Sequence, residues 1–313
     1  MAVKGTVTSH GGFGDRLRSG KTWQRWCESL SWYPFIIINL VVFVLFTGVP
    51  YLLMMRYSVL KWDLLTPPQF VGLGNFVQIL TDPKLHTAIK NTIFYMVVSV
   101  PAGAIVSLLM AVLVQHEIPG THFFRAVYYL PQVTSITVLA LVYWRLFSPR
   151  ADAPVNYLLG LVGVAPKAWF VDQKLAMPTV IGLSIWQSFG YTLLIWLAGL
   201  KGIPTELYDA ADVDGASGWR LLLYITIPLL RPTAAFILMI STIGALQVFA
   251  SIFLLTAGGP AYSTMTIVYY IYERSFTFNE YGYACAISIV LLVFILAVTL
   301  LEGKYLRYGE GHY

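Results

Sequence analysis

The sequence predicts an all-α protein that crosses a membrane several times. Of its 313 residues, 58% are hydrophobic and only 11% are charged, whereas soluble domains carry about 25% charged residues. The apolar residues also gather into long runs without charge, each long enough for a helix of about 20 residues to cross a bilayer. A helix satisfies all its backbone hydrogen bonds within one segment, so it is the expected spanning element.

These runs predict six spanning helices. We expect them at about residues 33–55, 91–115, 126–146, 177–200, 233–255 and 281–302. The fifth run is too long for one helix, and Gly258-Gly259-Pro260 breaks it, leaving a loop on the outer side. The spans form one domain, residues 33–305, between a leader at 1–32 and a tail at 306–313.

The basic leader predicts the orientation. Lysine and arginine outnumber acidic residues in the leader, and such segments stay on the cytoplasmic side. A signal peptide is the alternative, but the apolar run after Leu30 is longer than a signal core and shows no small-residue cleavage site. Both termini and the loop 201–232 are therefore expected in the cytoplasm.

The stretch from Glu206 to Pro228 is a long polar interval between two apolar runs, and its own pattern is helical. We expect Thr205 to cap a short helix in which Glu206 and Asp209 face the positive end of the helix dipole. Gly215 and Gly218 then end this helix, and a second helical run leads to Pro228. An ordinary acidic helix at the membrane surface is the alternative interpretation.

This loop resembles the coupling loop of ABC importer permeases. That family's pattern is E-A-A, three residues, G, nine residues, I-x-L-P, and Asp209-Ala210-Ala211, Gly215, Ile225 and Ile227-Pro228 fall at this spacing. Asp209 replaces Glu and Ile227 replaces Leu, which preserves charge and apolar character. The resemblance implies that the loop contacts an ATPase through Glu206, Asp209, Ala210, Ala211, Asp214 and Gly215.

Further segments are similar to the carbohydrate type within this family, the maltose and glycerol-3-phosphate permeases. They are Phe70-Val71-Gly72-Leu73-Gly74-Asn75-Phe76, Asn91-Thr92, Phe124-Arg125 before Leu130-Pro131, and Leu255 to Pro260. The resemblance implies the type I importer permease fold in a bacterial or archaeal cell membrane. It also implies a second permease subunit, two copies of an ATPase subunit and an external solute-binding protein as partners.

Two stripes of neutral polar residues flank the loop. Ser184, Gln187, Ser188 and Tyr191 fall within about 100° on the fourth span, and Ser241, Gly244, Gln247 and Ser251 within about 120° on the fifth. Hydroxyls, amides and an aromatic ring are suited to a sugar, although small polar residues also mediate ordinary helix packing in membranes. The candidate pathway residues are Gln187, Ser188, Tyr191, Ser241, Gln247 and Ser251.

The sequence offers no catalytic chemistry of its own. Gly20-Lys21-Thr22 lacks the first glycine of a phosphate-binding loop, so any ATP would be bound by a partner subunit and no cofactor is expected. Cys27 and Cys285 are unsuited to a disulfide or a metal site. No charge lies in the middle of a span, which disfavours a proton-coupled carrier.

We therefore expect a non-catalytic permease subunit of an ATP-driven sugar importer. An ABC permease for glycerol phosphate, a peptide or another solute is the alternative within the family. A secondary carrier or a membrane scaffold is the alternative outside it, and no nucleic acid is expected to bind.

Overall fold

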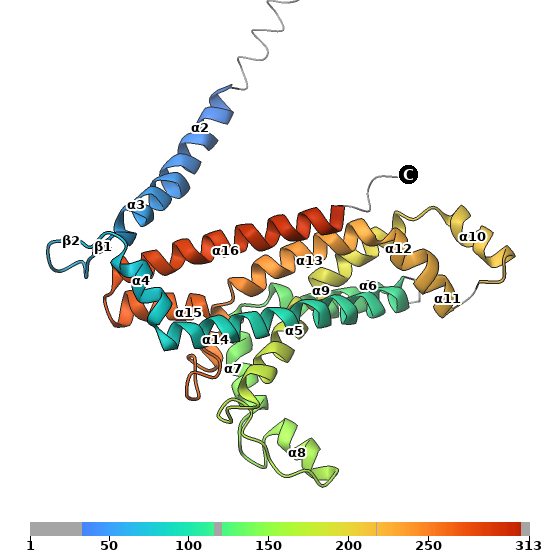
Figure 1. Cartoon of the computed structure of the whole chain (residues 1–313). Helices are drawn as coiled ribbons and strands as arrows, with labels where there is room; N and C mark the ends of the chain where they lie inside the picture. The colour runs from blue at the N-terminus through green and yellow to red at the C-terminus, as the bar shows by residue number, and fades with distance from the viewer. Residues whose placement is uncertain (1–32, 116–120, 217, 308–313) are drawn as a thin grey trace, which may run out of the picture. The chain divides into compact units, whose positions relative to one another are not determined.

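The computed structural model describes residues 33–115, 121–216 and 218–307. The leader at 1–32, which contains Cys27 and the basic residues that predict the orientation, lies outside the described residues. Of the tail at 306–313, only the first two residues are described. The chain divides into two compact units, Met1–Arg56 and Tyr57–Tyr313. The described residues of each unit are mostly helical (Figure 1).

The described part of the first unit forms one apolar helical stretch, whose last two residues belong to the second unit. It consists of α2 (Tyr33–Phe43), a π-helical turn η1 (Val44–Gly48) and α3 (Val49–Ser58). Residues Ile36–Ser58 have a mean hydropathy of 2.4, high enough for a membrane span.

The second unit begins with a two-stranded hairpin and then continues as helices. Strand β1 (Leu60–Lys61) pairs antiparallel with β2 (Gln69–Phe70). The helices of its first half are α4 (Gly74–Thr81), α5 (Pro83–Val114), α6 (Thr121–Val133), α7 (Ile136–Leu146), α8 (Pro154–Leu161) and α9 (Ala176–Lys201). Those of its second half are α10 (Thr205–Val213), α11 (Trp219–Leu221), η2 (Leu222–Thr226), α12 (Ile227–Leu229), α13 (Arg231–Leu246), α14 (Ala250–Leu255), α15 (Ile267–Tyr272), η3 (Glu273–Thr277) and α16 (Tyr281–Arg307).

Helix α5 starts earlier than the charge pattern predicted. Asp82 caps it, since its Oδ1 accepts hydrogen bonds from the backbone N–H groups of Lys84 (2.9 Å) and Leu85 (3.2 Å), and Pro83 occupies the first turn. Proline suits that position because its missing N–H would be unpaired there anyway. The helix therefore contains the polar turn before residue 91 that the prediction assigned to a loop.

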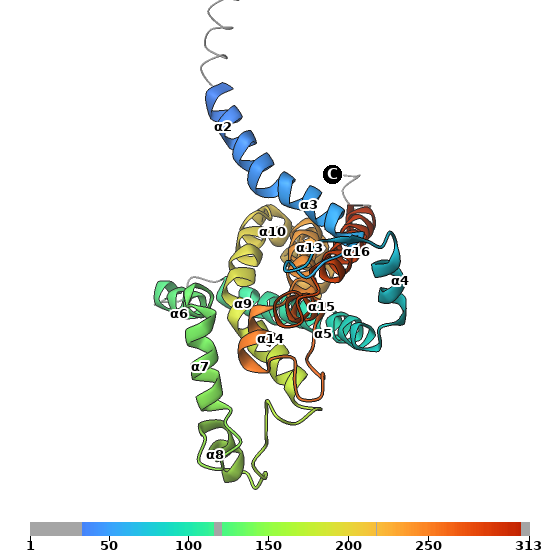
Figure 2. The same ribbon diagram turned by 90° about the vertical axis from the view of Figure 1, so that its left-hand side faces the viewer.

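Two predicted spans are broken. The segment predicted as one span at 126–146 forms α6 and α7, whose axes differ by 111°, and Figure 2 shows the corner between them. The predicted span at 233–255 is α13 followed by a separate α14, because the helix ends at Leu246. Four helices in the described part are long and apolar enough to cross a membrane. The count rises to six if two bent pairs each count as one span, namely α6 with α7, and Trp219–Leu229 with α13, which meet at 70°.

Helix α9 lies at the centre of the second unit, packed against α5, α6 and α13. Two of its glycines permit this packing: a Cβ on Gly190 would lie 2.2 Å from the carbonyl oxygen of Tyr128 in α6, and one on Gly199 would lie 2.5 Å from Oγ1 of Thr233 in α13. Small residues allow helix backbones to approach closely in membranes. The sequence patterns did not reveal this role of the glycines.

Candidate functional site

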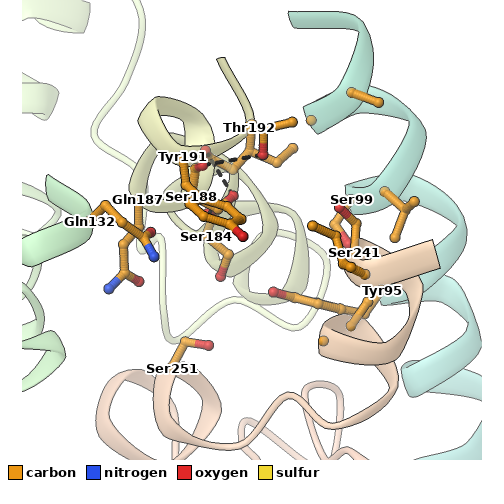
Figure 3. A pocket seen from close by; sticks show the side chains of 17 residues that line it. Tyr95, Ser99, Gln132, Ser184, Gln187, Ser188, Tyr191, Thr192, Ser241 and Ser251 are labelled. Atoms are coloured by element: carbon orange, nitrogen blue, oxygen red, sulfur yellow. Dashed lines mark hydrogen bonds between the residues drawn. The ribbon is translucent and has the colours of Figure 1, made fainter. Parts of the chain in front are cut away.

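A cavity of about 500 Å³ lies between α5, α6, α9, α13 and α14. Five of the six predicted pathway residues line it, namely Gln187, Ser188, Tyr191, Ser241 and Ser251. Figure 3 shows that their side chains surround a common space. The tertiary structure thus brings the two predicted stripes together.

Gln247 is the exception, since it is exposed and does not line the cavity. Its predicted position on the stripe requires one straight helix from Ser241 to Ser251. Helix α13 ends at Leu246, and Gln247 has φ −104° and ψ 14°, outside the helical range. Ser251 reaches the cavity from α14 and therefore does so independently of the predicted spacing.

Helices α5 and α6 also contribute to the cavity, which the polar stripes on the fourth and fifth spans do not predict. Tyr95 and Ser99 line the cavity from α5, and Gln132 lines it from α6. Tyr95 and Ser99 are four residues apart, so they share one helix face. Their spacing is a polar stripe on the second span, of the same kind as the stripe on the fourth span.

The cavity lining is polar but carries no Asp, Glu, Lys, Arg or His among the described residues. The Ser188 hydroxyl donates to the carbonyl oxygen of Ser184 (3.0 Å), and the Thr192 hydroxyl donates to that of Ser188 (3.3 Å). These hydroxyl oxygens remain free to accept further bonds. Because the amides of Gln132 and Gln187 make no hydrogen bond in the described part of the chain, the cavity offers neutral donors and acceptors to a ligand.

The carboxylate of Glu302, at the predicted end of the last span, contacts a neighbouring helix. Helix α16 continues to Arg307, so Glu302 is about 7.5 Å inside the helix end. Its Oε1 accepts a hydrogen bond from the buried Thr242 hydroxyl in α13 (2.7 Å). This pair joins α16 to the helix that carries Ser241.

The loop predicted for coupling folds as a short helix, an elbow and a second helical run. Helix α10 carries Glu206, Asp209 and Ala210 exposed to solvent, and Asp214 and Gly215 are exposed just beyond it. Gly215 (φ 75°) and Gly218 (φ 55°) form the elbow, in the left-handed region that glycine adopts without strain. In Figure 1 this loop lies at one end of the long helices, with β1, β2 and α4 at the other.

Two details of this loop differ from the prediction. Thr205 is the first helical residue rather than the cap, and no side chain caps the helix. Ala211 is only 5% exposed, so it faces inward and its surface is closed to a partner. The Tyr208 hydroxyl lies 3.4 Å from the Thr226 hydroxyl, which joins α10 to the returning helical run.

The described residues contain no group of three or more His, Cys, Asp or Glu side chains that could hold a metal ion. Outside the predicted spans, the carboxyl group of Asp82 has a shifted pKa. Burial raises the pKa, but hydrogen bonds from Tyr270, Tyr283 and two backbone amides lower it by more, so that it ends below its usual value. This group is structural, since it caps α5 away from the cavity lining.

Comparison with known proteins identifies the family. Residues 82–303 match the family described as "Binding-protein-dependent transport system inner membrane component". The probable ABC transporter permease protein YurN of Bacillus subtilis (strain 168) is 32% identical over 279 residues, which cover 88% of this chain and 95% of YurN. The arabinooligosaccharides transport system permease protein AraP of the same organism is 32% identical over 277 residues, covering 87% and 85%.

A solved structure shares the fold. The chain is similar to one in the "Crystal structure of bacterial alginate ABC transporter in complex with alginate pentasaccharide-bound periplasmic protein", with a TM-score of 0.81 and 25% identity over 91% of this chain and 97% of that one. The family match covers more than half of the sequence, and the relatives match along most of their length. The chain therefore belongs to the binding-protein-dependent transport system inner membrane components, the permeases of ABC transporters.

Proposed function

We propose that this chain is one of two permease subunits of an ATP-driven importer that takes up a neutral saccharide. The observation that carries the proposal is the cavity between α5, α9 and α13, which presents amides, hydroxyls and tyrosine rings without a charge. A saccharide needs such groups, since its hydroxyls pair with amides and its ring face packs on an aromatic ring. Relatives named for arabinooligosaccharide and lactose transport support this substrate class.

A glycerol phosphate importer is the second candidate. A relative from Agrobacterium fabrum named for sn-glycerol-3-phosphate transport, UgpA, is 32% identical over 241 residues. A phosphate group is normally held by charge-assisted hydrogen bonds from Arg or Lys, and the described lining has neither. The cavity therefore favours a neutral solute.

The test measures uptake into proteoliposomes that contain the whole complex, purified through a tag on this chain. We expect Gln187→Ala and Tyr191→Ala to reduce saccharide uptake while the complex still assembles. Gln247→Ala is the matched control, because it removes an amide outside the cavity lining, and it should leave uptake unchanged. Uptake of glycerol 3-phosphate in place of neutral sugars would contradict the substrate class, and normal uptake by both cavity variants would contradict the site.

We further propose that the chain has six spans with α10 in the cytoplasm and the β1–β2 hairpin outside. Single cysteines in a chain lacking Cys27 and Cys285 test this with an impermeant thiol reagent on intact cells. Leu65 (85% exposed) and Val213 (88% exposed) are suitable sites. Asn75 is not, since it is buried and its amide donates to the carbonyl oxygens of Ser58 and Leu60. Labelling at position 213 from outside would refute this topology.

The acidic loop is proposed to receive the movement of the ATPase subunits. Asp209 is exposed on a helix that is held to the returning run, so a basic group of the partner could reach it. Breaking a buried interfacial charge pair costs about 2–5 kcal/mol. Asp209→Lys should therefore abolish uptake and weaken ATPase co-purification, whereas Asp209→Glu should be tolerated. Normal uptake by Asp209→Lys with the ATPase fully bound would exclude this role.

A further inference from the structure

A row of aromatic rings crosses the second unit on the side of the β1–β2 hairpin. We call it the aromatic row, and it consists of Phe249 just before α14, Phe253 in α14, Tyr272 in α15, Phe276 in η3 and Tyr281 in α16. The ring centroids of Phe253 and Tyr272 are 5.2 Å apart, those of Tyr272 and Phe276 are 5.2 Å apart, and those of Phe276 and Tyr281 are 6.2 Å apart. Phe276 is 66% exposed and Phe253 39% exposed, so part of the row is uncovered.

The row ends beside a second cavity of about 420 Å³. Asn279, Glu280 and Gly282, which flank Tyr281 in the sequence, line this cavity, and Gln69, Gln78 and Trp62 line it from the hairpin and α4. The side-chain amides of Gln69, Gln78 and Asn279 make no hydrogen bond in the described part of the chain. The cavity therefore offers three uncommitted amides next to exposed rings.

Internal contacts fix the backbone that forms the wall of this outer cavity. The amide of Asn75 is buried and donates to the carbonyl oxygens of Ser58 (2.7 Å) and Leu60 (2.9 Å). Gly282 brings the start of α16 against the hairpin, because a Cβ there would lie 1.8 Å from the carbonyl oxygen of Leu60. These contacts fix the hairpin and α4 against each other and the start of α16 against the hairpin, and thus fix the backbone that carries the amides.

The chemistry of the surface favours a saccharide over lipid as its occupant. The hydroxyls of Tyr272 and Tyr281 have no hydrogen-bond partner in the described part of the chain, and lipid tails would leave them and the amides unpaired at a cost of several kcal/mol per group. A saccharide pairs with such groups and stacks its apolar ring faces on aromatic rings. Three charged residues line the cavity. Glu280 accepts from Arg274 (3.0 Å) and Asp63 accepts from Thr66, whereas the exposed Lys61 side chain makes no hydrogen bond or ion pair in the described part of the chain and adds a donor for saccharide hydroxyls.

We propose that the aromatic row and the outer cavity together bind an oligosaccharide on the outer side of this chain, at a site separate from the inner cavity. The separation follows from α14. Ser251 lines the inner cavity, whereas Phe253 lies two residues, about 200°, further along the same helix, and no residue of the aromatic row lines the inner cavity. This inference rests on the proposed saccharide transport and on the outer position of the hairpin.

The experiment is equilibrium dialysis of radiolabelled arabinose and arabino-oligosaccharides of two to five units against the whole complex in lipid nanodiscs, without binding protein. Phe276→Ala removes an exposed ring, and Gln78→Ala removes an exposed amide. Each should raise the Kd of the four- and five-unit saccharides about two- to tenfold, the change expected for losing one ring contact or hydrogen bond, and leave weak binding of the monosaccharide unchanged. Tyr305→Ala is the control, because it removes a ring that is 76% exposed but lies near the C-terminal end of α16, away from the aromatic row. The Kd values of this variant should equal those of the wild type.

Equal Kd values for the wild type and both variants would overturn the proposal, as would failure of the wild-type complex to bind any member of the series. Loss of the second permease from the purified Phe276→Ala complex would also overturn it, since the row would then be a subunit interface. The uptake assay distinguishes failure of the outer site from failure of the proposed saccharide transport. A complex that imports saccharide with its binding protein but fails the dialysis test contradicts only the outer site.

Discussion

Asp82 is the residue whose replacement should most disturb the outer end of the helix bundle. Its Oδ2 accepts hydrogen bonds from the hydroxyls of Tyr270 and Tyr283, and its Oδ1 accepts the two backbone bonds that cap α5. Tyr270 and Tyr283 are 0% and 4% exposed, so their hydroxyls have little access to water. Asp82→Ala therefore removes a helix cap, worth about 0.5–2 kcal/mol, and leaves two buried hydroxyls unpaired, at about 1–3 kcal/mol each.

We expect a total loss of about 3–5 kcal/mol, because contributions within one network are not fully additive. The measurement is the thermal unfolding of the purified complex in detergent, followed for Asp82→Ala, for the paired change Tyr270→Phe with Tyr283→Phe, and for the three changes combined. Asp82→Ala should cost much less in the background without the two hydroxyls. If the losses add without coupling, the network reasoning is wrong. Asp63→Ala is the control, since this carboxylate also accepts loop hydrogen bonds but lies at the surface.

The pH dependence of stability follows from the same carboxylate. Hydrogen bonding lowers the pKa of Asp82 in the folded protein below the ordinary value of 3.8. A depressed pKa means that the folded state favours the ionised form, so the stabilisation is fully present above about pH 4 and is lost as the pH falls through the folded pKa. The difference in unfolding temperature between wild type and Asp82→Ala should be constant from pH 5 to 8 and shrink below pH 4. A difference that grows on acidification would contradict the sign.

Two further predictions concern packing. Gly282→Ala should destabilise the protein by at least about 1–3 kcal/mol, since the new Cβ would lie 1.8 Å from the Leu60 carbonyl oxygen. Gly182→Ala is the control and should not destabilise it, because a Cβ there meets nothing within 4 Å. Equal unfolding temperatures for the two variants would rule out the close contact. Glu302→Ala should cost about 1–3 kcal/mol by leaving the Thr242 hydroxyl unpaired, while Glu302→Gln keeps an acceptor and should unfold near the wild-type temperature. If the Ala and Gln variants unfold together, the bond contributes nothing to stability.

The sequence by itself determined the features that depend on local composition. Charge-free runs of sufficient length identified the apolar helices, and the spacing of Asp209, Gly215 and Pro228 identified the helix and elbow of the polar loop as well as the family. These properties are readable because hydrophobic length, helix signals and glycine conformations act over a few residues. The neutral stripe on α9 was predictable for the same reason, since it lies on one unbroken helix.

Only the tertiary structure decided where helices break and which residues meet. The 111° corner between α6 and α7 and the end of α13 at Leu246 depend on packing against other helices, and they remove Gln247 from the cavity while bringing Gln132 and Ser251 into it. The contacts of Glu302 with Thr242 and of Asp82 with Tyr270 join residues 60 and 188 positions apart. A periodic pattern carries no information on such pairs, because their distance is set by how separate helices pack rather than by the spacing along either one.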